Sequence, residues 1–403
     1  MKRTKGKRMV LSSFSGCTSR RSIEIEFSLA LNNRTGKYFV CSDLIEAVDE
    51  LTENTWYWRI RSATVPYGLT ARILGRLMTT EYVTRISYPA LDAALGRRWR
   101  ANPMLFTDPL QVLFYRLKSS DIILCHDVGP VTHPQLYANG VEEAYGKAFK
   151  EVREARPHML FVSQNSQAEF HRLYGNEYAS SSVVYPPIRV SALGGELEPV
   201  AGISDKFLLT VGAVGSRKNQ AMCSRAFQRS GLADEGFSYV ICGGAEPGYD
   251  DVVSAANAVN NVLFTGYVTD SQLRWLYSRA SGFVLPSLLE GFGLPVAEAV
   301  AAGLIPLVTE GGTLHEITGN SAVLVDPTDI DSITHGMRAL VEFRCDERKE
   351  RLTALQAHIR QFTRAAAVAG WRSCVQRVLG GSDTKSASSV SLAANRPRDR
   401  AAS

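Results

Sequence analysis

The stretch GFVLPSLLEGFGLPVAEAVAAGLIPLVT, residues 282–309, contains two apolar runs separated by a segment of helical character. The runs GFVLPS (282–287) and LIPLVT (304–309) are rich in Val, Leu and Ile, as strands buried on both faces are. Between them, Pro295 suits the first turn of a helix that begins near Leu294. This order of strand, helix and strand predicts a parallel βαβ unit.

Similar apolar runs lie on both sides of this unit, and helix signals stand between them. Asp270 is expected as the N-cap of one helix, and Thr328 precedes another amphipathic stretch. The alternation predicts a Rossmann-like α/β domain with a parallel sheet. Its further expected strands are FLLTVG (207–212), SYVICGG (238–244), NVLFTGYV (261–268) and AVLVDP (322–327).

The first half of the chain has a weaker version of the same pattern, which predicts a second α/β domain. We expect a first Rossmann-like domain over residues 1–190 and a second over 203–380, facing each other across a central cleft. Residues 381–403 lack the apolar side chains needed for a core and are predicted to be disordered. The expected strands of the first domain are RMVLSS (8–13), KYFVCS (37–42), DIILCHD (121–127), HMLFVS (158–163) and SVVYPP (182–187).

Composition excludes several classes of protein. The chain has 403 residues and a net charge of +5, with positive residues scattered except at the start and at Arg97-Arg98, so nucleic acid is not expected as a partner. Its seven cysteines lie far apart without a CxxC pair, as in a cytoplasmic protein with reduced thiols and no metal site. No apolar stretch approaches the roughly 18 residues of a membrane span.

The loop after the run 282–287 has the character of a ligand site. A helix N-terminus that follows a parallel strand attracts anions, and Gly291 and Gly293 would allow close approach of backbone amides to phosphate. Glu290 and Glu298, however, would repel an anion, whereas carboxylates bind pairs of hydroxyl groups well. A ligand with both phosphates and diols, such as a nucleotide sugar, satisfies both features. Isolated glutamates in a loop and on a helix are otherwise ordinary solvated residues.

The string EGFGLPVAE (290–298) resembles the E-x7-E signature of family 4 glycosyltransferases. The segment LLTVGAVGSRKNQ (208–220) resembles their diphosphate-binding segment, and ILCHDVGPVTHP (123–134) resembles a strand and loop common in mannosyltransferase-like members. The resemblance implies retaining enzymes of the B-type glycosyltransferase fold, which has two Rossmann-like domains. It covers residues 120–380 and is strongest over 207–327.

The resemblance implies a set of catalytic residues. Lys218, helped by Arg217, would contact the diphosphate and stabilise the charge that develops as it departs. Many members carry an arginine where this chain has Gly212, so the resemblance implies either that Arg217 compensates or that the leaving group is held more weakly. His126 would approach the sugar from across the cleft, and Glu290 would orient the sugar hydroxyls. A structural histidine and a solvated Arg-Lys turn are the alternatives.

The resemblance also implies the donor-binding residues. Glu298 would bind the ribose, and Val268 lies in the loop GYVTD (266–270) that would border the base. The other expected donor-binding residues are Gly212, Gly291, Phe292, Gly293 and Leu294.

Together these patterns predict a metal-independent, retaining glycosyltransferase without a cofactor. It would move a hexose, mannose from GDP-mannose in the first place, to a hydroxyl of a glycan or lipid-linked acceptor in the synthesis of a surface polysaccharide. A UDP-hexose donor and a non-catalytic scaffold with the same fold are the alternatives. The expected location is the cytoplasm, with peripheral contact at the inner face of the membrane left open.

Overall fold

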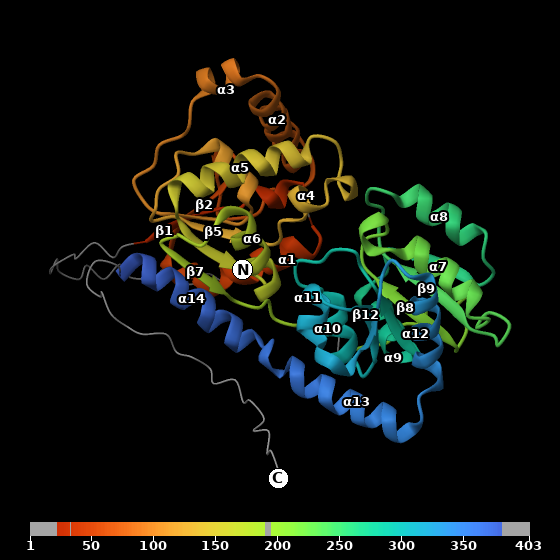
Figure 1. Cartoon of the computed structure of the whole chain (residues 1–403). Coiled ribbons are helices and arrows are strands. Elements are labelled where there is room, and N and C mark those ends of the chain that lie inside the picture. The colour runs from red at the N-terminus through yellow and green to blue at the C-terminus, as the bar shows by residue number, and fades with distance from the viewer. Residues whose placement is uncertain (1–21, 33, 190–194, 381–403) are drawn as a thin grey trace, which may run out of the picture.

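The computed structural model of the chain describes residues 22–32, 34–189 and 195–380. Its strands form two separate sheets, and helices cover the faces of both (Figure 1). The first sheet is built from residues 23–183 and the second from residues 207–325. The strand expected at residues 8–13 lies outside the described residues.

The first sheet has seven strands in the order β3-β2-β1-β4-β5-β6-β7. Neighbouring strands are parallel except β2 and β3, which form a short antiparallel hairpin. The strands span Ile23–Glu26 (β1), Thr52–Tyr57 (β2), Ile60–Arg61 (β3), Met104–Phe106 (β4), Ile122–Cys125 (β5), His158–Phe161 (β6) and Ser180–Val183 (β7).

One strand expected in this domain is wrong. Residues 37–42 belong to helix α1 (Gly36–Val48), not to a strand. The buried side chains of Val40, Leu44 and Val48 repeat every four residues, so they lie on one face of the helix, and that face packs into the core. The expected strand covered only the six residues 37–42, which are too few to show the four-residue repeat of a helix.

The remaining helices of the first domain lie around its sheet, and α2 and α3 project from the top of the molecule in Figure 1. They span Gly68–Ser87 (α2), Pro89–Leu95 (α3), Gly129–Thr132 (α4), Val141–Ala155 (α5) and Gln164–Tyr174 (α6).

The second sheet confirms all six strands expected in it. Its order is β10-β9-β8-β11-β12-β13, and all neighbours are parallel. The strand order reverses between β8 and β11, and ligands of open α/β sheets bind beyond the carboxyl ends of strands at such a reversal. The strands span Phe207–Val211 (β8), Ser238–Cys242 (β9), Val262–Gly266 (β10), Gly282–Leu285 (β11), Pro306–Thr309 (β12) and Val323–Val325 (β13).

The helices of this half begin close to the expected positions, but one N-cap was misassigned by one residue. Thr269, not Asp270, caps α9: its hydroxyl accepts from the backbone N–H of Gln272, whose side chain accepts from the backbone N–H of Thr269. Asp329, which follows Thr328, caps α12. The helices span Gln220–Arg229 (α7), Tyr249–Asn257 (α8), Asp270–Arg279 (α9), Leu294–Ala301 (α10), Gly312–Thr318 (α11), Ile330–Glu342 (α12), Cys345–His358 (α13) and Arg364–Gly380 (α14).

The last helix, α14, returns to the first domain and lies against α1 (Figure 1). The Arg372 Nε atom donates to the carbonyl oxygen of Ala47 at 2.6 Å, and Arg364 pairs with Asp43 at 3.0 Å. The range expected for the second domain, 203–380, therefore includes a helix that packs on the first. Within the described ranges, no helix combines the length and apolar character of a membrane span.

Candidate functional site

The reversal of strand order in the second sheet brings a buried ion pair together. Lys218 lies in the short 3₁₀ turn Ser216–Lys218 that follows β8, and Glu290 lies in the loop after β11. The Lys218 Nζ atom pairs with Oε1 of Glu290, and both side chains are 7% exposed. The Ser287 hydroxyl also donates to Glu290 Oε1, at 2.9 Å. The two expected catalytic residues thus meet where the topology places a ligand.

Arg217 adds a second cation to this pair. Its NH1 atom lies 3.7 Å from Glu290 Oε2, and its NH2 atom lies 3.1 Å from Glu246 Oε2. Burial raises the pKa of Glu290, but attraction to Lys218 and Arg217 outweighs it and holds this pKa below its usual value. The glutamate is therefore ionised at neutral pH. Gly212 lies beside the pair, because a Cβ atom there would be 3.6 Å from Lys218 Cε.

His126 follows β5 in the first domain, and its side chain is buried. Burial, and then repulsion by Lys37, lower its pKa to about 4, so the ring is neutral near pH 7. Its Nε2 atom lies 3.0 Å from the carbonyl oxygen of Thr107, which assigns the ring proton to Nε2. The Nδ1 atom is then a hydrogen-bond acceptor.

Lys37 is a site residue that the sequence reasoning missed. It lies in the first turn of α1, with Nζ 3.7 Å from Asp108 Oδ2 and 4.0 Å from Asp127 Oδ2. Burial raises the pKa of Asp127, but attraction to Lys37 and then to Arg217 of the other domain lowers it overall. The helical period of residues 36–48 would have placed Lys37 at a helix start, but it gives no sign of the contacts with Asp108 and Asp127, which are distant in the sequence.

The two domains meet beside these groups with little space between their backbones. A Cβ atom on Gly291 would lie 2.6 Å from the carbonyl oxygen of His126, and one on Gly129 would lie 2.0 Å from Leu289 Cδ2. Ser166 Oγ lies 3.0 Å from the carbonyl oxygen of His126 and 3.3 Å from that of Gly291. His126 and the loop that carries Glu290 are therefore held next to each other across the domain interface.

Glu298 lies in α10 and has a different environment from Glu290. Its side chain is 6% exposed, and Oε2 accepts a hydrogen bond from the Tyr277 hydroxyl at 3.1 Å. Burial raises its pKa to about 7, although Arg189 and Tyr277 act to lower it. A residue expected to bind ribose thus lies under the surface and pairs with a neighbouring helix.

The other expected donor-binding residues surround the start of α10 and the end of β10. Leu294 is the first residue of α10, and its N-cap Gly293 has φ of 95°, a backbone conformation that favours glycine. Phe292 is buried and packs edge-on against Phe362. Val268 is half-buried in the loop after β10.

Residues 198–355 match the model of the family described as glycosyl transferases group 1. The match spans the whole second sheet. The resemblance to family 4 glycosyltransferases is thereby confirmed, and this match together with the glycosyltransferase relatives below supports a hexosyltransferase enzyme.

Two relatives of this glycosyltransferase are curated as O-antigen enzymes. The chain is 26% identical over 309 residues to O-antigen chain mannosyltransferase B of Escherichia coli, a match that covers 73% of this chain and 77% of that protein. It is 26% identical over 216 residues to O-antigen chain mannosyltransferase RfbU of Salmonella typhimurium, covering 53% and 58%.

A solved structure supports the fold. Sucrose-phosphate synthase from Thermosynechococcus elongatus superposes with a TM-score of 0.61 at 16% identity, covering 90% of this chain and 100% of that one. The expected architecture of two Rossmann-like domains in the B-type fold is confirmed.

Proposed function

We propose that this glycosyltransferase moves mannose from GDP-mannose, with retention at the anomeric carbon, to a hydroxyl of a glycan or lipid-linked oligosaccharide in the synthesis of a surface polysaccharide. The observation that carries the proposal is the buried group of Lys218, Arg217 and Glu290 at the strand-order reversal. The names of the two relatives support mannose as the sugar. A UDP-hexose donor is the alternative.

The ion pair between Lys218 and Glu290 suggests how the donor enters. The diphosphate takes the place of the Glu290 carboxylate next to Lys218 and Arg217, and the released carboxylate accepts hydrogen bonds from the sugar hydroxyls. Each buried charge keeps a partner before and after this exchange, which avoids the large penalty of an unpaired buried charge. Lys218 and Arg217 then stabilise the diphosphate as it departs.

His126 acts through hydrogen bonding and not through charge. A ring with a pKa near 4 is neutral, and its fixed Nε2–H leaves Nδ1 to accept from a sugar hydroxyl. Because its carbonyl oxygen is next to Gly291, His126 lies beside the loop that carries Glu290. The two residues would then contact the same hexose from the two domains.

We further propose that the reaction needs neither a metal ion nor a cofactor. Two cations and the positive end of the α10 dipole supply positive charge beside the proposed diphosphate position. These groups could serve in place of a divalent cation. The proposed place of action is the cytoplasmic face of the membrane, where a lipid-linked acceptor would be reached by peripheral contact.

A donor screen with chelator tests these proposals. Purified enzyme in EDTA is incubated with GDP-mannose, UDP-glucose and UDP-galactose, and release of the nucleoside diphosphate is followed. We expect release from GDP-mannose, and loss of most of it in Lys218→Met but not in Lys349→Met, an exposed lysine of α13. Preferential release of UDP from a UDP-sugar would assign a UDP-hexose as the donor in place of GDP-mannose. Complete loss of activity on chelation would overturn metal independence, and donor binding without turnover would favour a non-catalytic scaffold.

A further inference from the structure

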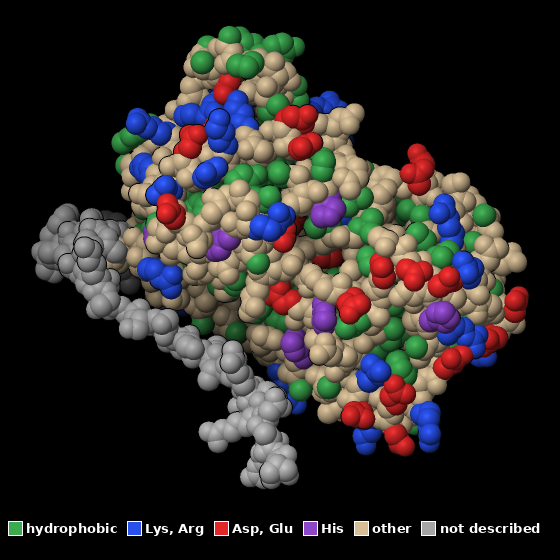
Figure 2. All heavy atoms as spheres, viewed as in Figure 1, with side chains coloured by type: hydrophobic (Ala, Val, Ile, Leu, Met, Phe, Trp, Pro, Cys, Tyr) green, Lys and Arg blue, Asp and Glu red, His purple; other side chains and the backbone are tan. Residues whose placement is uncertain are grey.

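Helices α2 and α3 present an unusually apolar surface. Leu69, Ile73 and Leu77 repeat every four residues and form one stripe along α2, and their side chains are 72%, 49% and 49% exposed. Figure 2 shows hydrophobic side chains gathered at the top of the molecule, where Figure 1 places these helices. We call this surface the α2–α3 face. Its other exposed apolar residues are Tyr67, Val83, Tyr88, Leu91 and Leu95.

The exposed charges of the segment that carries this face are of one sign. Between residues 55 and 120, all within the described chain, the acidic residues are Glu81, Asp92 and Asp108, whose side chains are only 8%, 12% and 4% exposed. The basic residues of the same segment are in part exposed, and Arg72 and Arg76 lie directly beside the apolar stripe of α2. This segment therefore offers apolar and positively charged groups to a partner and no exposed carboxylate, while Glu151 of the neighbouring helix α5 is 26% exposed and pairs with Arg97.

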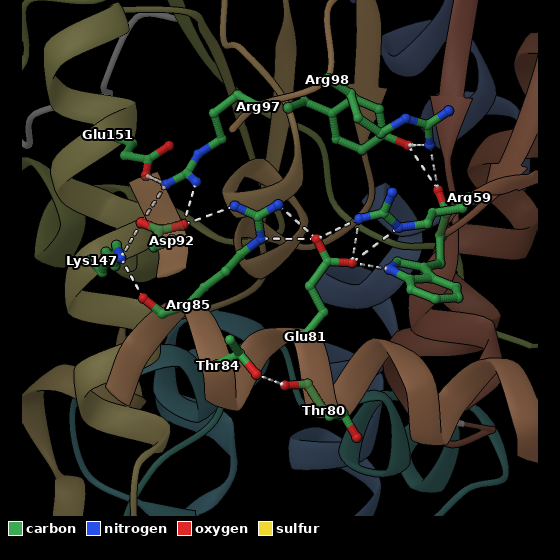
Figure 3. A network of polar contacts seen from close by, with 12 residues as sticks. Arg59, Thr80, Glu81, Thr84, Arg85, Asp92, Arg97, Arg98, Lys147 and Glu151 are labelled. Atoms are coloured by element: carbon green, nitrogen blue, oxygen red, sulfur yellow. Dashed lines mark hydrogen bonds and ion pairs between the residues drawn. The ribbon is translucent and has the colours of Figure 1, made fainter. Parts of the chain in front are cut away.

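The side chains of Glu81 and Asp92 are paired with basic residues in a network of hydrogen bonds and ion pairs (Figure 3). Glu81 accepts from Arg85 at 2.6 Å, and Asp92 accepts from Arg85 at 2.8 Å and from Lys147 of α5 at 2.7 Å. Arg59 of the loop between β2 and β3 completes the pairing of Glu81 at 2.9 Å. This network joins α2, α3 and α5 and fixes the polar side of α2 and α3 to the rest of the domain. The apolar side of these helices therefore faces outward in the folded domain.

We propose that the α2–α3 face docks on an anionic lipid surface. Exposed leucines and tyrosines insert between lipid head groups, and Arg72 and Arg76 pair with lipid phosphates, as in helices that lie in a membrane interface. A second copy of the chain fits less well. A symmetric dimer through this face would bring the same arginines of both copies close together without an exposed carboxylate between them.

The inference deepens the proposed function, because it names the surface by which the enzyme would reach a lipid-linked acceptor. α2 and α3 belong to the first domain, which we expected to bind the acceptor, whereas the Lys218–Glu290 pair belongs to the second. Docking through the first domain would leave the second facing away from the bilayer. It would then remain free to exchange nucleotides with the cytoplasm.

Co-sedimentation of the whole chain with vesicles tests the proposal. We expect binding to mixed phosphatidylcholine and phosphatidylglycerol vesicles, and weaker binding to phosphatidylcholine alone. The variant Leu69→Ser/Ile73→Ser/Leu77→Ser and the variant Arg72→Glu/Arg76→Glu should each reduce the binding roughly 10-fold or more. Added salt should weaken the part of the binding that depends on Arg72 and Arg76. The variant Arg72→Glu/Arg76→Glu should therefore respond less to salt than the wild type does.

Matched substitutions provide the control. Arg156→Glu/Arg172→Glu reverses two arginines of the same domain that are 63% and 60% exposed, and it should leave vesicle binding unchanged. Vesicle binding equal in all variants, or absent in the wild type, would overturn the proposal. A dimer that is lost on Leu69→Ser/Ile73→Ser/Leu77→Ser, without vesicle binding, would assign the face to a second copy and also overturn it.

Release of GDP from GDP-mannose without vesicles separates this inference from the proposed function. The surface variants should retain that release, because their substitutions lie in α2 and not beside Lys218 or Glu290. An enzyme that binds vesicles but does not use any nucleotide sugar would contradict the proposed function and leave the docking surface intact. An enzyme that turns over its donor but does not bind vesicles would support the proposed function and overturn the docking surface.

Discussion

The carboxylate of Glu316 accepts a hydrogen bond from the backbone N–H of Gln164 across the domain interface, with 2.7 Å between Oε1 and N. Its second oxygen accepts from the backbone N–H of Asn165 at 2.8 Å, and the Tyr185 hydroxyl donates to Oε1 at 2.9 Å. Glu316 lies in α11 of the second domain, whereas Gln164 begins α6 of the first. One carboxylate therefore satisfies the free amides of a helix in the other domain.

We predict that Glu316→Ala loosens the contact between the domains. The change removes two charge-assisted hydrogen bonds to backbone amides, each worth about 1.5 to 3 kcal/mol in favourable settings. The radius of gyration from small-angle X-ray scattering should rise, and the thermal midpoint should fall. Glu350→Ala, in an exposed position of α13, is the control and should change neither. Unchanged scattering for Glu316→Ala would mean that other contacts suffice to hold the domains together.

The buried cations of the site should contribute unequally to turnover. Lys218 is nearly buried and pairs directly with Glu290, whereas Arg217 is 22% exposed and shares its contacts between Glu290 and Glu246. Lys218→Ala should lower kcat roughly 10- to 1,000-fold, by analogy with loss of one oxyanion donor. Arg217→Ala should cost less. Both kcat and KM are measured, with circular dichroism to confirm folding; near-normal turnover of a folded Lys218→Ala enzyme would leave only a structural ion pair.

The second sheet was predictable because its strands are buried on both faces and therefore appear as continuous apolar runs. The first strand of the other sheet, β1, has the sequence IEIE and gave no such run, although all four residues are buried. Burial raises the pKa of its Glu26 to about 8, so this side chain is neutral at pH 7 and accepts from the backbone N–H of Ser28 at 3.2 Å. A neutral, hydrogen-bonded glutamate is tolerated in a core. A glutamate in the sequence, however, is normally taken to indicate a solvent-exposed position, so the pattern IEIE did not predict a buried strand.

The candidate site likewise contains residues that could be predicted from the sequence and residues that could not. Lys218 and Glu290 could be predicted because each lies in a motif of the second domain that is recognisable within a few residues. Lys37 and Glu316 could not, because their partners Asp108 and Gln164 are distant in the sequence and meet them only through the tertiary fold. Local spacing contains no information about such contacts.

The two glutamates of the signature should separate kinetically. Glu290 pairs with Lys218 and is proposed to exchange this contact for the sugar hydroxyls, so Glu290→Gln should mainly lower kcat. Glu298 is predicted to contact the ribose, so Glu298→Gln should mainly raise the KM for the donor, as loss of uniform binding does. Steady-state kinetics with GDP-mannose measure both. A lower nucleotide affinity for Glu290→Gln, with unchanged affinity for Glu298→Gln, would reverse the two assignments.

The buried carboxyl of Glu298 should also make stability depend on pH. Its pKa is raised from 4.5 to about 7 in the folded chain, so the folded state holds a proton that the unfolded state has already lost between these values. The stability that it contributes is complete below pH 4.5 and is lost as the pH rises through about 7. Glu298→Gln imitates the protonated form at every pH.

The variant should therefore gain stability over the wild type as the pH rises. The difference in unfolding free energy should grow from below about 1 kcal/mol at pH 5 to about 3 kcal/mol at pH 8.5. Thermal midpoints of the two proteins, recorded in parallel at both pH values, measure this difference. The other buried carboxyls, including Glu26, are common to both proteins and cancel in the comparison. A midpoint difference that does not change with pH would show that Glu298 is ionised throughout, already paired with a cation such as Arg189.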